Sequence, residues 1–459
     1  MKSREVTGFY VAILALAGLV HLSFGGTTAV AREGGGPAAS TPSALSIPST
    51  SSTPSAPSTS SSLKKGDAFS LGGRRCVLAK LDTLPYVESD YTKRFKFDAY
   101  DNPKLKALRE KYGLDDVVSG GKDEFDRQVL LLDWVNHRFK KFGRPTSDAR
   151  GALAILEAIE AGHTFFCSHY ADVFVSAAAS LGWVDRSLAL RRPDSVGQGS
   201  TEHSSTEIWS NQHRKWVMFD PLFAMYVEKS PPSHDGGYSR GVPLNAFELR
   251  QKWFYRDARD LVFVLDKERK RYRKSDLPIF RSRHAGFGDL SLDPSALIVY
   301  AFIGYIPNTN LMDAGPDYGR MFITKDRLCE GTKWHTRVAP ADPATDPYFP
   351  IGQATLSLVP DGAGLRIALK TLTPNFKTYM ARTDGGEWKP VGDAFTWTPL
   401  ARSRSDSNGP PPYVGGYRLE VKTVNQFGVD GPVSTAEVET DAKADVGRPL
   451  ASPTSAVGQ

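Results

Sequence analysis

Cysteine is scarce in this chain, with three residues among 459. Because three cysteines cannot all pair, at least one is left as a free thiol or as a link to another molecule. Clusters of Asp and Glu of the kind that bind calcium are missing. The Cys-x-His spacing at Cys167 and His169 could be half of a zinc site, but no second cluster completes it. We therefore expect no metal and no cofactor.

Long apolar runs and strong net charge are also missing. The apolar run at 9–24 is shorter than the roughly 20 residues of a membrane-spanning helix, and the run at 296–306 is far too short, so we predict a buried strand there. The net charge of +6 is modest, and the basic residues are scattered apart from KERKRYRK at 267–274. Such a run is typical of a solvated face, so we expect no nucleic-acid partner.

The N-terminus has the pattern of a secretory signal. Lys2 and Arg4 precede the apolar run, and Ala29 and Ala31 offer the small residues that an export peptidase reads. We expect cleavage after Ala31 and a protein exported to the periplasm, the cell surface or the medium. An uncleaved N-terminal transmembrane anchor is the alternative, and it is the one membrane contact that we expect.

Composition divides the rest of the chain. Ser, Thr and Pro dominate 32–66, where too little apolar surface exists to offset chain entropy, so this segment should be a disordered linker. Short alternating strands separated by turns fill 351–441 and predict a β-sandwich of the immunoglobulin or fibronectin type III kind. The predicted order is a signal peptide at 1–31, the linker at 32–66, a first folded domain at 67–250, an extension of uncertain fold at 251–350, the sandwich at 351–441 and a disordered tail at 442–459.

The domain at 67–250 begins with helical patterns. Apolar spacing predicts helices at 125–143, ended by Gly143, and at 147–163, with Ser147 as the N-cap. A third helix should start near Cys167, because its apolar residues recur from Tyr170 at offsets 0, 3, 4, 7, 8 and 11. Strands follow at 188–190, 206–210 and 215–221, with NQHR as a hairpin turn between the last two. Helices followed by an antiparallel sheet predict an α+β fold.

Sequence context separates the three cysteines. Cys76 and Cys329 lie among Gly and charged residues that resemble loops, whereas Cys167 lies in a strongly apolar segment. For an exported protein, our hypothesis is a disulfide between Cys76 and Cys329, with Cys167 free. Taken alone, Cys167 could be a small core residue, or a thiol whose thiolate the helix N-terminus stabilises.

A catalytic thiol also needs a base. His169 lies two residues after Cys167 on the same helix and cannot face it, and His163 precedes the helix in a loop. If Asn211 and Gln212 form a two-residue turn, His203 lies opposite Asp220 on one face of the hairpin, and a longer turn shifts this register. The hairpin thus joins an imidazole to a carboxylate that can orient it.

Three segments in this order resemble the transglutaminase-like superfamily, whose core is papain-like. They are FFCSHYADVFVSAAASLGW, HSSTEIWS and KWVMFDP, within roughly 120–250. The resemblance implies Cys167 as nucleophile, His203 as general base and acid, and Asp220 as the group that orients His203. It also implies acyl transfer through a thioester, ending in peptide cleavage, deamidation or crosslinking.

The resemblance leaves several points open. The backbone N–H of Cys167 can supply one oxyanion donor, and a second could come from Trp183, Trp209 or Trp334. We expect a peptide or protein substrate, with cell-envelope material as one source, and the oligomeric state stays open. The alternative function is a non-catalytic binding or scaffold protein on the same fold.

Overall fold

The computed structural model describes residues 61–191, 203–230, 240–255, 258–273, 280–281, 291–292, 296–312, 322–324, 339–341, 347–401 and 416–440. The predicted signal peptide and tail lie outside the described residues, as does most of the predicted linker. The last residues of that linker are described, and they belong to the folded part: the Leu63 N–H donates to the Leu358 carbonyl at 2.9 Å. Among the described helices, none is both long and apolar enough to cross a membrane.

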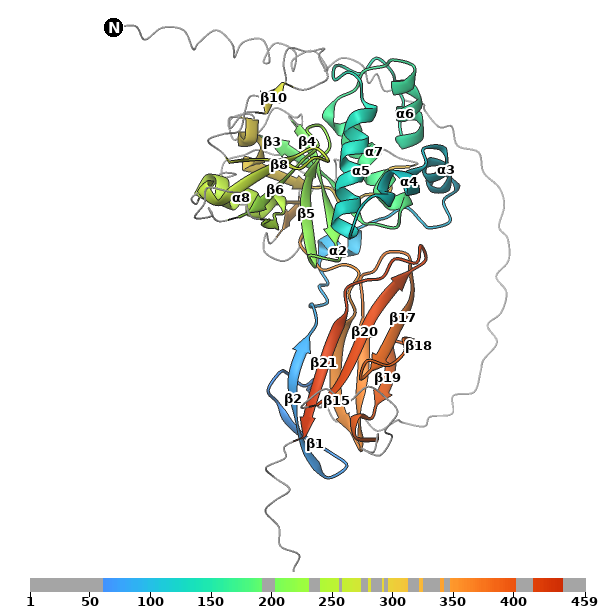
Figure 1. The fold of residues 1–459 in the computed structure, drawn as a ribbon, viewed down its shortest axis with the longest axis vertical. Helices are drawn as coiled ribbons and strands as arrows, with labels where there is room; N and C mark the ends of the chain where they lie inside the picture. Colours follow the sequence, from blue (N-terminus) through green and yellow to red (C-terminus); the bar gives the residue numbers. More distant parts are fainter. Residues whose placement is uncertain are drawn as a thin grey trace, which may run out of the picture. The chain divides into compact units, whose positions relative to one another are not determined.

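Within the described residues, helices α2 to α7 precede the first strand of the large sheet (Figure 1). They are α2 (Asp90–Arg94), α3 (Pro103–Lys111), α4 (Leu114–Ser119), α5 (Glu124–Arg138), α6 (Ala152–Glu160) and α7 (Cys167–Ser180). Local capping explains several of their starts. The Asn102 side chain accepts from the Lys104 N–H ahead of Pro103, and the Asp123 side chain accepts from the Asp126 N–H.

The loop between α5 and α6 is longer than the sequence pattern predicts. Helix α5 ends at Arg138, because Phe139 is extended and buried. Helix α6 begins at Ala152, after Gly151 with φ +77°, and not at Ser147. The Ser147 hydroxyl accepts from the Ala149 N–H, which forms a local turn in place of the predicted N-cap.

A large sheet follows the helices. Its strands are β3 (Asp185–Arg191), β4 (His203–Ser210), β5 (Lys215–Asp220), β6 (Met225–Lys229), β7 (Val242–Pro243), β8 (Leu261–Leu265), β9 (Lys270–Arg273), β12 (Phe302–Tyr305), β13 (Phe322–Thr324) and β14 (Ala339–Ala341). The order is β14-β13-β12-β3-β4-β5-β6-β8-β9, with β7 also paired to β6. Its pairs are antiparallel except β13 with β14.

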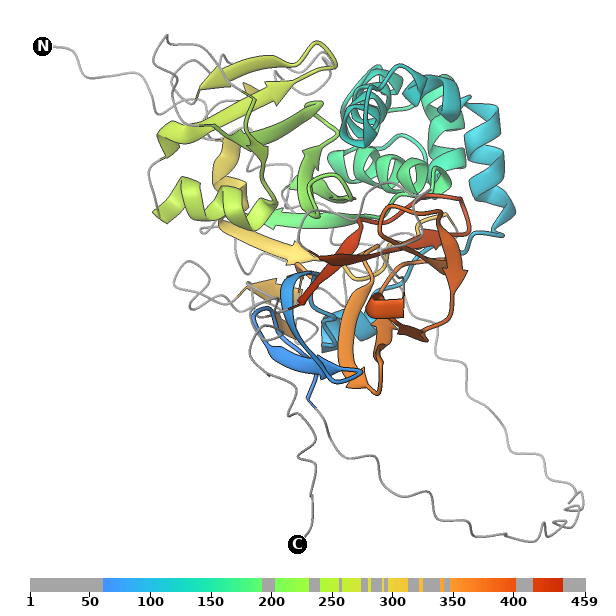
Figure 2. The same ribbon diagram turned by 60° about the horizontal axis from the view of Figure 1, so that its bottom comes forward.

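The two faces of this sheet are covered by different elements. Ile208, Val217 and Phe219 share a buried cluster with helices α3 to α7, which lie together in both views (Figure 1 and Figure 2). The alternate residues Trp209 and Trp216 pack on the other face, against helix α8 (Ala246–Tyr255) and neighbouring segments. Helices followed by an antiparallel sheet make this an α+β arrangement, as the sequence predicts.

Strand pairing crosses the boundary that the sequence pattern suggests at residue 250. Strands β8, β9 and β12 come from the segment at 251–350, yet they extend the same sheet as β4 and β5. The predicted strand at 296–306 is half correct, because a 3-10 helix, η3 (Ala296–Ala301), precedes β12. The rest of this segment contributes η2 (Ala258–Asp260), β10 (Phe280–Arg281) and β11 (Ser291–Leu292).

Two further sheets share one hydrophobic cluster. One has the order β1 (Ala68–Leu71), β2 (Arg74–Asp82), β21 (Ser434–Thr440), β20 (Tyr417–Asn425), β17 (Phe376–Thr383) and β18 (Lys389–Val391). The other has the order β15 (Thr355–Asp361), β16 (Gly364–Lys370) and β19 (Ala394–Trp397), followed in the chain by η5 (Pro399–Ala401). Leu78, Leu356 and Val421 are among the side chains that fill the shared cluster.

Strand β2 pairs with β1 on one side and with the C-terminal strand β21 on the other, although the sequence pattern groups β1 and β2 with the helices. Cys76 lies on β2 opposite Thr440, fully buried and free, so its predicted disulfide does not form. Its expected partner, Cys329, lies outside the described residues. The prediction treats GGRRCVLAK as a loop, but pairing with a strand more than 350 residues away makes most of it a strand, with Cys76 and Leu78 buried. Burial raises the pKa of the Cys76 thiol, which keeps it protonated.

Candidate active site

Cys167 is the first residue of helix α7. The chain is held extended before it, because the Gly143 N–H donates to the Phe165 carbonyl at 3.1 Å and Phe166 has φ −85° and ψ 171°. No side chain caps this helix start, and its first turn holds no acidic residue. The unpaired N–H groups and the positive end of the helix dipole therefore favour a thiolate at the half-buried Cys167.

His203 and Asp220 lie on adjacent strands and contact each other directly. His203 Nε2 and Asp220 Oδ2 are 2.7 Å apart, with 12% and 2% of the two side chains exposed. The two-residue turn does not form, and the longer turn shifts the register by two residues: Ser210 pairs with Lys215 and Asp220 therefore lies opposite Ser205. A shift of two residues keeps both side chains on one face, and a diagonal neighbour is within reach of an imidazole.

The turn after β5 fixes the second oxygen of Asp220. Asp220 Oδ1 accepts from the Leu222 N–H at 3.1 Å. The buried Asn136 of α5 donates its amide to the carbonyls of Pro221 and Leu222, at 3.1 and 2.7 Å. Both carboxylate oxygens are thus occupied, and a helix holds the turn that carries them. The sequence analysis does not single out Asn136, and its signal is an amide among the apolar residues of α5.

The electrostatics of the pair favour a charged histidine. Burial opposes protonation of His203, but the charge and hydrogen bond of Asp220, with smaller contributions of the same kinds from Cys167, raise the pKa of His203 to about 10. Asp220 occupies Nε2, so Nδ1 is the ring nitrogen left for Cys167. The arrangement suits an imidazolium beside a thiolate, with the carboxylate behind the ring.

The two histidines nearest to Cys167 in sequence have other surroundings. His169 Nδ1 lies 3.3 Å from the Ser168 hydroxyl, and its ring centre lies 4.7 Å from that of Phe165. Burial lowers the pKa of His169 to about 4, so it is neutral at physiological pH. His163 Nδ1 lies 3.0 Å from the Thr146 hydroxyl. Of the three histidines, His203 is the one whose ring interacts with Cys167.

Two of the three tryptophans considered as oxyanion donors are in the wrong place. Trp183 follows the C-terminus of α7, and the 14 residues of that helix separate its ends by about 20 Å. Trp209 lies six positions along β4 from His203, about 20 Å away, and its Nε1 donates to Asn211 Oδ1 at 2.8 Å. Trp334 lies outside the described residues. The Cys167 N–H stays as the single assigned donor.

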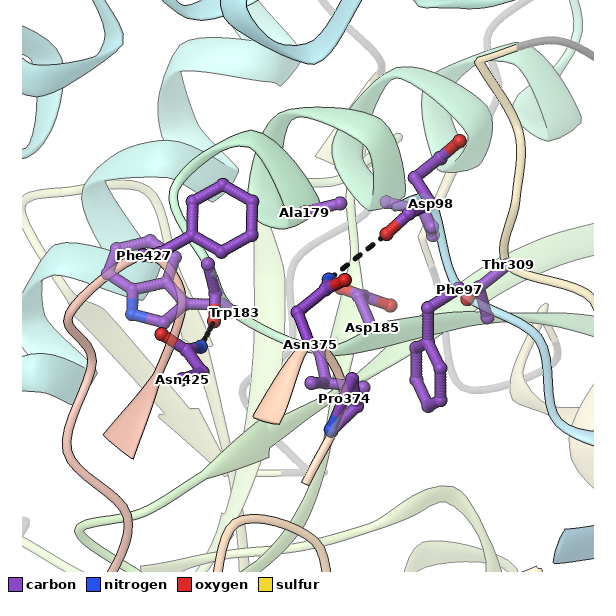
Figure 3. A pocket seen from close by; sticks show the side chains of 13 residues that line it. Phe97, Asp98, Ala179, Trp183, Asp185, Thr309, Pro374, Asn375, Asn425 and Phe427 are labelled. Carbon is purple, nitrogen blue, oxygen red and sulfur yellow. Dashed lines mark hydrogen bonds between the residues drawn. The ribbon is translucent and has the colours of Figure 1, made fainter. Parts of the chain in front are cut away.

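A small cavity at the far end of α7 is separate from these residues (Figure 3). It has a volume of about 20 Å³, which accommodates about one water molecule. Asn425 donates to the Gly182 carbonyl at 3.0 Å and Asn375 to the Asp98 carbonyl at 3.1 Å, so β20 and the segment before β17 close it. Burial raises the pKa of Asp185 in its wall well above the ordinary range of a carboxyl group. The cavity is too small, and too far from Cys167, to be a peptide-binding cleft.

Comparison with known proteins adds little to this geometry. No family model matches the chain, and no curated protein does. Among solved structures, a chain from Cytophaga hutchinsonii described as a "Putative Cysteine Protease" matches at 12% identity with a TM-score of 0.22. The match covers 32% of this chain and 48% of that one, about half its length. At so low a score the likeness carries no argument, and the function must be argued from the site.

Proposed function

We propose that this protein is a cysteine-dependent acyl-transfer enzyme of the transglutaminase-like type. The observation that carries the proposal is the line of Cys167, His203 and Asp220, in which one imidazole joins a thiol at a helix N-terminus to a buried carboxylate. These three residues come from a helix and two strands, and they are the residues that the sequence motifs indicate. The order of helices before an antiparallel sheet supports the same superfamily.

In the first half of the reaction, the Cys167 thiolate attacks the carbon of a carboxamide and a C–S bond forms. The oxyanion that develops can accept a hydrogen bond from the Cys167 N–H. The C–N bond then breaks, and the His203 imidazolium gives its proton to the leaving amine. The products of this half are a thioester on Cys167 and a free amine or ammonia. Asp220 holds the ring in the orientation that this transfer needs.

In the second half, water or a second amine attacks the thioester. His203, now neutral, accepts the proton of the attacking group, and the C–S bond breaks to regenerate the thiolate. Water makes the enzyme a peptidase or a deamidase, whereas a lysine amine makes it a crosslinking enzyme. The same three residues take part in all three reactions. The site therefore specifies formation of the thioester, but not which group attacks it afterwards.

The remainder of the proposal concerns where the enzyme works. We propose export, from the signal-like N-terminus, and a peptide or protein substrate outside the cytoplasm. The two sheets that share the cluster of Leu78, Leu356 and Val421 are proposed as an immunoglobulin- or fibronectin type III-like module. Such a module fits a role as an accessory binding unit beside the catalytic residues.

A peptide-library experiment tests this function. Wild type and Cys167→Ala are incubated with the library, with and without an added primary amine, and the products are read by mass for cleavage, deamidation and crosslinking. We expect products from wild type alone, together with a thioester adduct on the Cys167 peptide after acid quench. Identical spectra for wild type and Cys167→Ala would reject the enzyme and favour the binding protein.

A further inference from the structure

The loop between α5 and α6 carries an unusual concentration of positive charge. Lys140, Lys141, Arg144 and Arg150 are all exposed, and this set is called the basic loop below. Asp148 is the single acidic residue between Phe139 and Gly151. Within the described residues, none of the four cations takes part in an ion pair.

Several other cations of the helical part are paired. Arg109 contacts Asp115 at 2.6 Å, and Lys111 contacts Glu157 at 2.7 Å. Unpaired charges of one sign repel each other, so a surface that concentrates them attracts an anion from solution. The cations of the basic loop are therefore available to bind an anionic ligand, unlike the paired cations nearby.

Hydrogen bonds hold the basic loop against the segment that leads to the nucleophile. The Thr146 N–H donates to the Thr164 carbonyl at 3.2 Å, and the Thr164 hydroxyl donates to the Arg144 carbonyl at 2.6 Å. With the Gly143 bond to Phe165, these contacts end two residues before Cys167. Burial lowers the pKa of His169, and the charge of Arg150 lowers it further, so that charge reaches the first turn of α7.

The immediate surroundings of Cys167 do not cancel this positive field. The first turn of α7 has no acidic residue. Asp220 balances the charge of His203, 2.7 Å away, so the excess positive charge beside the site is that of the basic loop. Phe166, directly before the nucleophile, is 39% exposed, and its ring centre lies 6.2 Å from that of Phe142 in the loop. The residues around the thiol thus combine an apolar platform with unpaired cations.

We propose that the acyl donor is an acidic peptide, whose carboxylates flank the reacting carboxamide and contact the basic loop while its apolar part rests on Phe166. Arg144 and Arg150 can bind a carboxylate with two parallel hydrogen bonds, and Lys140 and Lys141 act as point charges. This inference rests on the proposed acyl-transfer function and names the substrate class of the same site.

Matched peptides test the donor class. Two peptides share one reacting glutamine, with Glu on both sides in the first and Gln on both sides in the second. For wild type at low salt we expect kcat/KM about tenfold higher for the acidic peptide, falling as ionic strength rises. The double variant Lys140→Glu/Lys141→Glu should lose this preference. The control Arg366→Glu/Lys377→Glu makes the same charge change on exposed residues of β16 and β17, and should keep it.

The outcomes separate the two proposals. If no library peptide reacts with wild type, the acyl-transfer function fails and the donor proposal fails with it. If both peptides react equally, the donor proposal alone is overturned. A rate that ignores peptide charge but is inhibited by a single-stranded oligonucleotide would assign the basic loop to nucleic acid, which also overturns it.

Alkylation of Cys167 measures the field without any peptide. Iodoacetate and iodoacetamide both transfer a carbon to the thiolate and release iodide, but only iodoacetate is an anion. At low salt we expect the iodoacetate-to-iodoacetamide rate ratio at Cys167 to exceed that of free cysteine about fivefold, and to drop in Lys140→Glu/Lys141→Glu. Labelling of Cys167→Ala gives the background from the other cysteines. A ratio equal to that of free cysteine would overturn the proposal.

Discussion

At the scale of the residue, the main feature is that hydrogen bonds fix both carboxylate oxygens of Asp220. One oxygen contacts His203 Nε2 and the other accepts from the Leu222 N–H, so the carboxylate cannot rotate without losing a bond. The sequence motifs predict that Cys167, His203 and Asp220 act together, because the proposed chemistry restricts those positions to a few residue types. They do not identify Asn136, because its contribution depends on where a helix meets a turn 85 residues further along the chain.

Replacing Asp220 should move the pH profile in a defined direction. In wild type the pKa of His203 is about 10, above the unfolded value of about 6.5, so the imidazolium is kept through neutral pH and lost as pH rises through about 10. The ion pair of His203 with Asp220 contributes fully to the stability of the fold below about pH 6.5. That contribution is lost as the pH rises through about 10. In Asp220→Asn burial acts unopposed, so the alkaline limb of kcat/KM should shift down by about 1–3 pH units.

The same variant should lose about 10²- to 10⁴-fold in kcat/KM at neutral pH, because the ring is no longer oriented. The measurement is kcat/KM from pH 5 to 11. Asp82→Asn, which removes the partner of Arg214, is the control and should leave the profile in place. An unchanged alkaline limb in Asp220→Asn would show that His203 does not set it.

Thiol reactivity tests the other side of His203. An imidazolium next to Cys167 stabilises its thiolate, so His203→Ala should slow alkylation by iodoacetamide at pH 7 about tenfold or more. His163→Ala is the matched control, since that ring contacts Thr146 and should not alter the rate. Equal rates in wild type and His203→Ala would remove His203 from the activation of the thiol.

Asn136 should act as a positioning residue. Asn136→Asp keeps the shape but loses both donors to the Pro221 and Leu222 carbonyls. We expect a cost of about 1–3 kcal/mol in the free energy of unfolding and a downward shift of the alkaline limb, because Asp220 is held less well. Asn102→Ala, which removes the N-cap of α3, should cost about 1 kcal/mol and leave the pH profile unchanged. Matching profiles for both variants would make Asn136 merely structural.

At the scale of the element, the β4–β5 hairpin decides how the histidine and the carboxylate meet. Its strand residues follow from alternation and β-propensity, and the structure places both strands as predicted. Its register does not follow, because the sequence allows either a two-residue turn at Asn211 and Gln212 or a longer one, and the structure has the four-residue turn. Tertiary contacts hold this turn: Glu124 of α5 accepts from the Asn211 N–H at 2.7 Å.

The burial of Glu124 predicts how the stability of the fold changes with pH. Burial raises the pKa of Glu124 to about 7 despite hydrogen bonds from the Asn211 and Gln212 region, so the folded state prefers the neutral acid. Stability is therefore lost as pH rises from about 4.5 through about 7. Glu124→Gln keeps the hydrogen-bond acceptor but cannot become charged. The change in the free energy of unfolding that it causes should therefore be about 2 kcal/mol more favourable at pH 8 than at pH 4. Urea unfolding at both pH values checks this. The same difference at both would contradict the burial argument.

At the scale of the whole molecule, the two ends of the described chain meet in one sheet. Strand β2 pairs with β21, which lies more than 350 residues later, and β12 joins the sheet of β3. The loop between β20 and β21 also contacts the end of α7, because Phe427 lies against Gly182, just past that end. The helix that starts at Cys167 thus contacts the two-sheet part at its other end.

Substitutions at two glycines that follow helix ends can measure how much the contact between Gly182 and Phe427 contributes to stability. Gly162 and Gly182 follow α6 and α7 with φ of +91° and +82°, but an added Cβ meets nothing within 4 Å at Gly162 and lies 2.6 Å from Phe427 Cβ at Gly182. Gly162→Ala should cost about 1 kcal/mol through backbone strain alone. Gly182→Ala should cost at least about 1 kcal/mol more, through the clash. Equal losses in thermal or urea unfolding would show that the contact with Phe427 contributes nothing.

Local physics alone determined much of this protein. Helix α7 begins at Cys167 because an extended segment gives way there to an apolar stripe, and the hairpin strands follow from their alternation; both can be seen in consecutive residues. The tertiary structure decided the diagonal meeting of His203 with Asp220, the support from Asn136, and the membership of β2 and β12 in their sheets. Those features depend on which surfaces meet after long loops close. Burial and hydrogen bonding select that outcome over the whole chain, and no short window of sequence contains it.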